Sequence, residues 1–113
     1  MEDDTILSEL EKILLEKLGY HVCGHADNAR DAITGIQKKN PDLVLLDIEL
    51  HENYEGILVG DFLNSKTNIP FIYVSGHDDK LTIEKARKTV PDGFLLKPFN
   101  DSQLRVAIEM AVR

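Results

Sequence analysis

Three polar side chains of different types each follow a short apolar run of this sequence: Asp47, Ser75 and Lys97. An acidic cluster, Glu2–Asp4, stands near the start of the chain. A carboxylate can attack phosphorus and form an aspartyl-phosphate. A lysine and a hydroxyl can then stabilise charge on the phosphoryl oxygens. These residue types are therefore suited to phosphoryl transfer, provided that the fold brings them together.

The acidic residues of such a site would need a cation. Carboxylates held close together repel one another, which raises their pKa values unless a positive charge neutralises them. Mg²⁺ suits a shallow site of two or three carboxylates, where it keeps several of its waters. With this ion bound, Asp47 stays ionised and can act as the nucleophile. The pattern therefore predicts Mg²⁺ as the cofactor.

Each of these residues also has an ordinary structural interpretation. Glu2–Asp4 could cap the first helix and complement its dipole, and Asp47 could be a solvated turn residue. Ser75 alone fits a turn, and Lys97 alone fits a surface position. The joint pattern favours a site, because all of them fall at comparable places in a regular alternation of elements.

That alternation follows from two hydrophobic periodicities. Helical spacing and capping residues predict helices over Thr5–Leu18, from Asn28 to the break at Asn40–Pro41, over Gly56–Ser65, over Asp79–Val90, and from a capping box of Asn100 and Gln103 onward. Apolar runs predict strands at Tyr20–Gly24, Leu43–Asp47, Ile69–Val74 and Phe94–Leu96. Strands that alternate with helices pair in parallel through right-handed crossovers, so the predicted fold is α/β with an open, doubly wound sheet.

Such sheets place their sites beyond the carboxyl ends of the strands, where Asp47, Ser75 and Lys97 would meet. The expected inward-facing side chains of three helices are Ile57, Leu58 and Phe62; then Leu81, Ile83, Ala86 and Val90; then Leu104, Ala107, Ile108 and Ala111. Cys23 is expected to be a small core residue rather than a reactive thiol. Tyr20 and Tyr73 are expected to pack.

Composition narrows the class of protein. The 113 residues fit one domain, and 42% of them are hydrophobic, which suffices for an ordinary core. The net charge of −7 argues against nucleic-acid binding by this chain. A single cysteine excludes an intrachain disulfide, and the apolar runs are too short for a membrane span. No signal sequence opens the chain, so a cytoplasmic location is expected.

The chain resembles a receiver domain of a two-component response regulator, of the CheY-like superfamily, over essentially residues 1–113. The matching segments are Met1–Asp4, Pro41–Ile48, Phe71–Gly76 and Asp92–Phe99. The resemblance implies a flavodoxin-like sheet with the strand order 2-1-3-4-5. Relatives have an apolar first strand before the acidic pair, where this chain has only Met1, so a truncated or misassigned start is expected.

The resemblance also implies a role for each site residue. Asp47 resembles the phosphoacceptor, and Glu2, Asp3, Asp47 and the backbone carbonyl of Glu49 would hold Mg²⁺. Ser75 and Lys97 would bind the phosphoryl group, Phe94 resembles the aromatic switch residue, and the bond before Pro98 is expected to be cis.

The implied function is a signalling switch rather than an enzyme. The expected donor is a phosphohistidine on a sensor histidine kinase or a phosphotransfer protein. The expected output is altered contact with a downstream protein, or with a second copy, through the helix Asp79–Val90, the strand Phe94–Leu96 and the last helix.

Two other functions stay open. A phosphorylation-independent interaction module with the same fold is disfavoured because the acceptor, hydroxyl and lysine are all present. An aspartate-nucleophile phosphohydrolase is disfavoured because Glu49 replaces its second aspartate, and because the chain is too short for a cap domain. Multiple turnover of phosphate monoesters would support the hydrolase.

Overall fold

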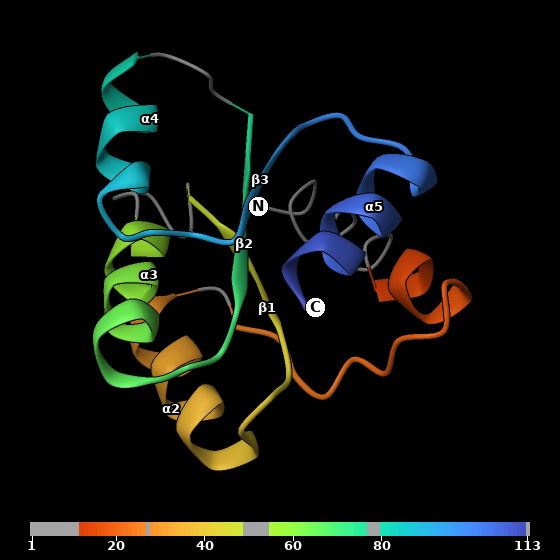
Figure 1. The fold of residues 1–113 in the computed structure, drawn as a ribbon. Helices are drawn as coiled ribbons and strands as arrows, with labels where there is room; N and C mark the ends of the chain where they lie inside the picture. Colours follow the sequence, from red (N-terminus) through yellow and green to blue (C-terminus); the bar gives the residue numbers. More distant parts are fainter. Residues whose placement is uncertain (1–11, 27, 49–54, 77–79, 113) are drawn as a thin grey trace.

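A parallel three-stranded sheet lies between two layers of helices in the computed structural model, which describes residues 12–26, 28–48, 55–76 and 80–112 (Figure 1). The strands are β1 (Val44–Asp47), β2 (Phe71–Ser75) and β3 (Gly93–Leu96). The helices are α2 (Ala29–Lys39), α3 (Glu55–Lys66), α4 (Lys80–Arg87) and α5 (Asp101–Ala111), and residues 12–17 are also helical. The predicted α/β fold with a parallel sheet is confirmed.

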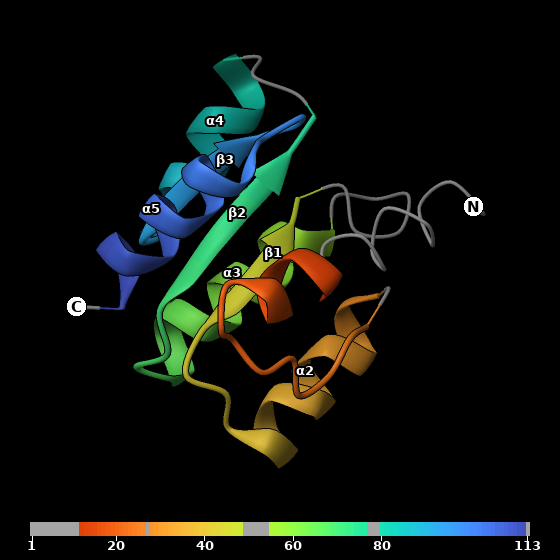
Figure 2. The same ribbon diagram turned by 90° about the vertical axis from the view of Figure 1, so that its right-hand side faces the viewer.

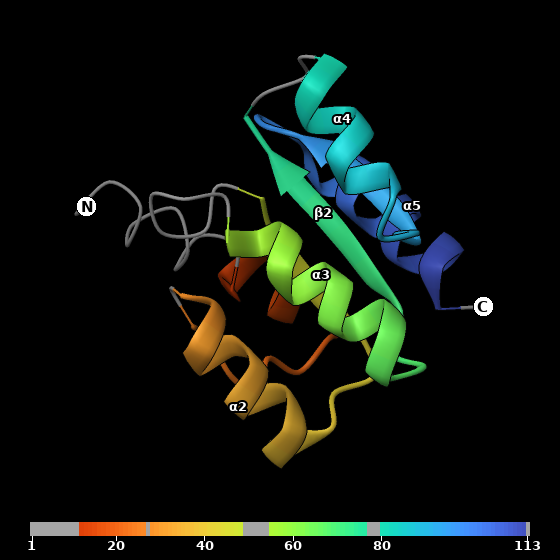
Figure 3. The same cartoon turned by 90° about the vertical axis from the view of Figure 1, so that its left-hand side faces the viewer.

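The helices cover the two faces of the sheet unequally. Helices α2, α3 and α4 lie along one face, with α3 between the other two (Figure 3). Helix α5 and residues 12–17 lie on the opposite face (Figure 2). Each face has its own apolar cluster: Leu46, Ile48, Val59, Phe71 and Tyr73 under α3, and Ile72, Val74, Leu104 and Ile108 under α5.

The strands run in the order β1-β2-β3, with Asp47 opposite Val74 and Ser75 opposite Leu96. The central strand β2 is buried along its whole length. Because side chains of a strand alternate between faces, Tyr73 and Ser75 lie on the α3 side of β2. This order matches that of the last three strands expected from the sequence.

The helix starts follow the predicted capping residues. The Asn28 side chain accepts a hydrogen bond from the Asp31 amide at the start of α2. At the start of α5, Asn100 and Gln103 form the predicted capping box, with donor–acceptor distances of 2.8 and 2.9 Å. These bonds satisfy amide groups that the first turn of a helix leaves without partners.

The predicted strand Tyr20–Gly24 is wrong. Residues 20–26 belong to no helix or strand, and Cys23 is exposed rather than part of the core. A strand needs a hydrogen-bonded neighbour, and among the described residues β1 pairs with β2 alone. The expectations about Met1 and the chain before it fall outside the described residues.

Two of the predicted helix faces are wrong in part: Ile57 and Phe62 pack against the core and Ala86 is buried, as predicted, but three other side chains are not. Leu58 of α3, and Leu81 and Val90 at α4, are exposed. Helix α3 instead buries Gly56, Val59, Gly60 and Leu63, because its glycines allow close approach to the sheet. Helix α4 buries the small side chains Thr82 and Ala86. The expected face of α5 is confirmed by Leu104 and Ile108. No helix in the described part of the chain has both the length and the apolar character of a membrane span.

Candidate functional site

Three of the predicted site residues meet at the carboxyl-terminal rim of the sheet. Asp47 is the last residue of β1, Ser75 the last of β2, and Lys97 follows the last residue of β3. The parallel register brings these strand ends to one edge of the molecule. The predicted convergence of these three residues at one rim of the sheet is therefore confirmed.

The Asp47 carboxylate and the Lys97 ammonium form an ion pair, with Lys97 Nζ 2.8 Å from Asp47 Oδ2. The two side chains are 37% and 28% exposed, respectively, so the pair is open to solvent. The backbone amide of Lys97 also donates a hydrogen bond of 2.8 Å to the Ser75 carbonyl. This bond fixes the start of the Lys97 side chain beside β2.

Ser75 is fully buried at the end of β2, one strand away from Asp47. Its side chain is therefore enclosed by protein, whereas the Asp47 carboxylate is partly open to solvent. A ligand on Asp47 would sit at the surface, and Ser75 would approach it from the interior.

Gly56 is a site residue that sequence reasoning missed. It lies in the first turn of α3 and donates a backbone hydrogen bond of 3.3 Å to the Ile48 carbonyl. A Cβ atom at this position would overlap the backbone carbonyl oxygen of Asp47. A glycine at the start of the helix that follows β1 was the available signal. It allows α3 to support the backbone of Asp47.

Phe94 lies on β3 opposite Tyr73 of β2, with ring centroids 6.4 Å apart. Its ring packs against the core cluster on the α3 side, while Leu95 packs on the α5 side. The peptide bond between Lys97 and Pro98 is cis, as predicted. Phe94 is thus partly buried and in contact with the central strand.

The predicted metal ligands are only partly described. Glu2, Asp3 and Glu49 fall outside the described residues, and within those residues no cluster of three or more His, Cys, Asp or Glu side chains could hold a metal ion. The described ligand candidate, Asp47, offers partly exposed carboxylate oxygens, the kind of donor that Mg²⁺ prefers. The described part of the site is therefore compatible with this ion.

Comparison with known proteins agrees with this geometry. The family model of the response regulator receiver domain matches residues 1–109. The transcriptional regulatory protein KdpE of Staphylococcus aureus is 33% identical over all 113 residues, which cover 48% of KdpE. PdtaR of Mycobacterium tuberculosis, also a transcriptional regulatory protein, is 30% identical over 98% of the chain and 54% of PdtaR. The chain spans about half the length of these relatives.

Solved structures with the same fold include further receiver domains. The signal receiver domain of a modulated diguanylate cyclase from Desulfovibrio desulfuricans G20 is 34% identical, with a TM-score of 0.84 over 92% of this chain and 82% of that one. A CheY-like receiver domain protein from Methanospirillum hungatei JF-1 is 25% identical, with a TM-score of 0.86 over 97% and 87% of the two chains. Family, fold and strand-end residues agree, and the chain belongs to the response regulator receiver domain family.

Proposed function

We propose that Asp47 accepts a phosphoryl group from a phosphohistidine of a sensor histidine kinase or phosphotransfer protein, and that this transfer changes the interaction surface of the domain. The observation that carries the proposal is the 2.8 Å pair of Asp47 and Lys97 at the sheet rim, beside the buried Ser75. The pair places a partly exposed nucleophile beside a cation that can stabilise the negative charge of the transferred phosphoryl group.

The proposed step is an in-line transfer. An Asp47 carboxylate oxygen forms a bond to phosphorus while the bond from phosphorus to the histidine nitrogen breaks, and the electron pair leaves with the imidazole. Lys97 then pairs with a phosphoryl oxygen instead of the carboxylate alone. Ser75 donates its hydroxyl to another phosphoryl oxygen, which requires local rearrangement because its side chain is buried.

Mg²⁺ is the proposed cofactor. Glu2, Asp3, Asp47 and the backbone carbonyl of Glu49 would hold it, and the ion would supply positive charge for the phosphoryl oxygens. Asp47 contributes oxygen ligands at the end of a strand, a position from which it can be both ligand and nucleophile.

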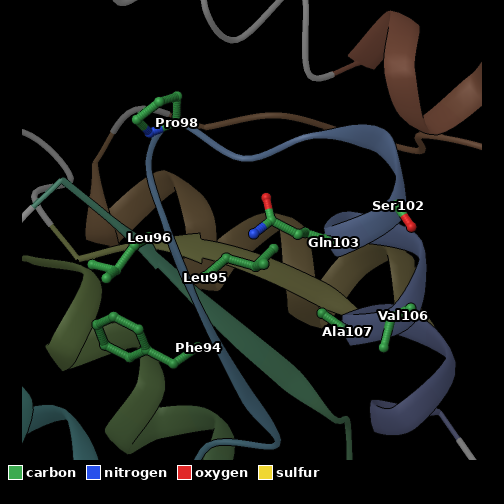
Figure 4. Close-up of a pocket in the computed structure, with 8 residues that line it drawn as sticks. All are labelled: Phe94, Leu95, Leu96, Pro98, Ser102, Gln103, Val106 and Ala107. Atoms are coloured by element: carbon green, nitrogen blue, oxygen red, sulfur yellow. The ribbon is translucent and has the colours of Figure 1, made fainter.

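The proposed output surface is formed by α4, β3 and α5, on which Leu81, Leu96, Val106 and Met110 are exposed apolar side chains. Figure 4 shows a groove of this surface, lined by Leu96 and Pro98 on one side and by Gln103 and Val106 of α5 on the other. Phe94 and Leu95 of β3 also line this groove (Figure 4). A downstream protein or a second copy of the domain would bind here after phosphorylation.

The test is incubation with acetyl phosphate and Mg²⁺, followed by intact mass. A gain of one phosphoryl mass is expected in the wild type and absent in Asp47→Asn. Asp42→Asn is the matched control, because Asp42 is exposed and lies before the opposite end of β1. A folded wild type that gains no mass would overturn the proposal, as would a gain that persists in Asp47→Asn. Multiple turnover of phosphate monoesters would favour the hydrolase instead.

A further inference from the structure

A chain of hydrogen bonds connects the centre of the sheet to the end of α4. The Tyr73 hydroxyl lies 2.5 Å from Thr89 Oγ1, and both side chains are buried. Thr89 Oγ1 also lies 2.7 Å from the Ala86 carbonyl, to which it donates its proton. Since a hydroxyl has one proton to donate, Thr89 must accept from Tyr73. The direction of the chain is thus Tyr73 to Thr89 to Ala86.

The Tyr73 side chain lies where β2, β3 and α3 pack together. It lies on the same face of β2 as Ser75, two residues away, and opposite Phe94 of β3. A Cβ atom at Gly60 of α3 would overlap the Tyr73 hydroxyl, so α3 closes over this side chain directly. A shift of Ser75 or Phe94 would therefore displace the Tyr73 ring, because the packed interior leaves it little room.

Helix α4 buries little apolar surface. It is eight residues long, and its buried side chains are the small Thr82 and Ala86. Leu81 in its first turn and Val90 beyond its last turn are exposed. Elements with little buried apolar surface open more readily than the rest of a protein. The hydrogen bond from Tyr73 to Thr89 accordingly adds a buried polar contact between the sheet and the residues that follow α4.

We propose that the hydrogen bond from Tyr73 to Thr89 is a latch that holds α4 against the sheet in the unphosphorylated domain and opposes phosphorylation of Asp47. The effect on phosphorylation of Asp47 rests on the proposed function, whereas the hold on α4 does not. When Ser75 moves toward a phosphoryl group on Asp47, the neighbouring Tyr73 moves with the strand, and Thr89 loses its donor. The end of α4 is then released, and the surface that it shares with β3 changes.

The first test is amide hydrogen exchange of the unphosphorylated protein. Tyr73→Phe removes the donor but leaves Thr89 bonded to the Ala86 carbonyl, so no buried polar group loses its last partner. Exchange within Thr82–Arg87 should accelerate about fivefold, which corresponds to one ordinary hydrogen bond, while α3 and α5 stay unchanged. Tyr20→Phe, on the other face of the sheet, is the matched control. Unchanged exchange in α4, or equal acceleration in every helix, overturns the latch.

The second test is the rate at which acetyl phosphate and Mg²⁺ modify Asp47. The rate should rise about fivefold in Tyr73→Phe and in Thr89→Val, and stay near that of the wild type in Thr89→Ser, which keeps the hydroxyl. If Thr89→Val fails to fold, Tyr73→Phe and Thr89→Ser still give the comparison. Faster exchange in α4 without faster phosphorylation overturns the coupling. A wild type that is never modified refutes the proposed function and with it the coupling, while the exchange result decides the latch.

Discussion

The first turn of α3 rests on the backbone of Asp47, because a Cβ atom at Gly56 would overlap the Asp47 carbonyl oxygen. Gly56→Ala must therefore push α3 away from β1 or displace Asp47 relative to Lys97. Overpacking of this kind costs about 1–3 kcal/mol of unfolding free energy. We expect a lower urea midpoint and slower modification of Asp47 by acetyl phosphate.

Gly35 supplies the control for this substitution. It lies within α2, and a Cβ atom there would contact nothing within 4 Å. Gly35→Ala should raise the free energy of unfolding by up to about 1 kcal/mol, since alanine favours the helix. A similar loss of stability in both variants would contradict the specific role of Gly56.

Replacement of Lys97 should lower the reactivity of Asp47 much more than it changes the free energy of unfolding. Both partners of the Lys97–Asp47 pair are partly exposed, and water screens the attraction. Lys97→Met should change the free energy of unfolding by less than about 1 kcal/mol. It should slow acetyl phosphate modification at least tenfold, roughly, because a cation that stabilises the transferred charge is lost.

Lys17→Met is the comparison for Lys97→Met. Lys17 pairs with Asp101 at 3.4 Å on the surface, remote in sequence from the strand ends. Its replacement should leave the modification rate unchanged. If Lys97→Met modified Asp47 at the wild-type rate, the pair would be an ordinary surface contact.

The sequence predicted the convergence of the strand-end residues better than it predicted the packing. Asp47, Ser75 and Lys97 were found because apolar runs mark buried strands, and parallel strands end at one rim. The capping box of Asn100 was found because its signal is local. Interactions between distant segments carry no comparable signal.

The errors follow from such distant interactions. The segment Tyr20–Gly24 has the composition of a strand, but strand formation depends on a neighbour elsewhere in the chain. The buried face of α3 was misplaced because apolar spacing gives no weight to Gly60, which packs directly on Tyr73. Contact between Tyr73 and Thr89 joins residues 16 positions apart, and neither has a sequence pattern that predicts it.

Ionisation of Tyr73 should make stability depend on alkaline pH. Burial raises the pKa of Tyr73 above its ordinary value of 10.0, and the negative charge of Asp61 acts in the same direction. The folded state therefore favours the neutral phenol. This contribution to stability is complete below about pH 10 and is lost as the pH rises through the folded-state pKa. The free energy of unfolding should fall more steeply above about pH 10 in the wild type than in Tyr73→Phe.

Urea unfolding across this pH range measures the effect, and the phenolate absorbance lost in Tyr73→Phe should titrate above the ordinary tyrosine value. Tyr20→Phe should keep the steep dependence of the wild type. Equal dependence in the wild type and Tyr73→Phe would show that the Tyr73 phenol does not contribute.

A charge on the surface formed by α4, β3 and α5 should affect output without affecting phosphorylation. Val106 is 52% exposed on α5, so Val106→Asp should be tolerated by the fold. It should abolish any increase in apparent mass that follows phosphorylation, as measured by light scattering. Leu58→Asp, on the exposed side of α3, should leave that increase intact. Equal effects of the two substitutions would argue against a specific surface.

Val90 adopts a backbone conformation that valine rarely tolerates. Its φ angle is 54°, in the left-handed region, where a Cβ atom costs about 1–2 kcal/mol. The side chain is 64% exposed, so its removal sacrifices little apolar contact. Glycine adopts this conformation without strain but loses about 0.5–1 kcal/mol of chain entropy on folding. Val90→Gly should therefore raise the free energy of unfolding by about 0.5–1 kcal/mol in urea titration.

Val106→Gly is the opposing control, since Val106 is an exposed valine within the regular helix α5. There glycine relieves no strain and weakens the helix by a few tenths of a kcal/mol, roughly. The two substitutions remove the same atoms from exposed positions, so only the backbone angle distinguishes them. If Val90→Gly raises the free energy of unfolding and Val106→Gly lowers it, the turn after α4 stores strain next to Thr89. If both substitutions lower it, the surrounding contacts favour valine at position 90.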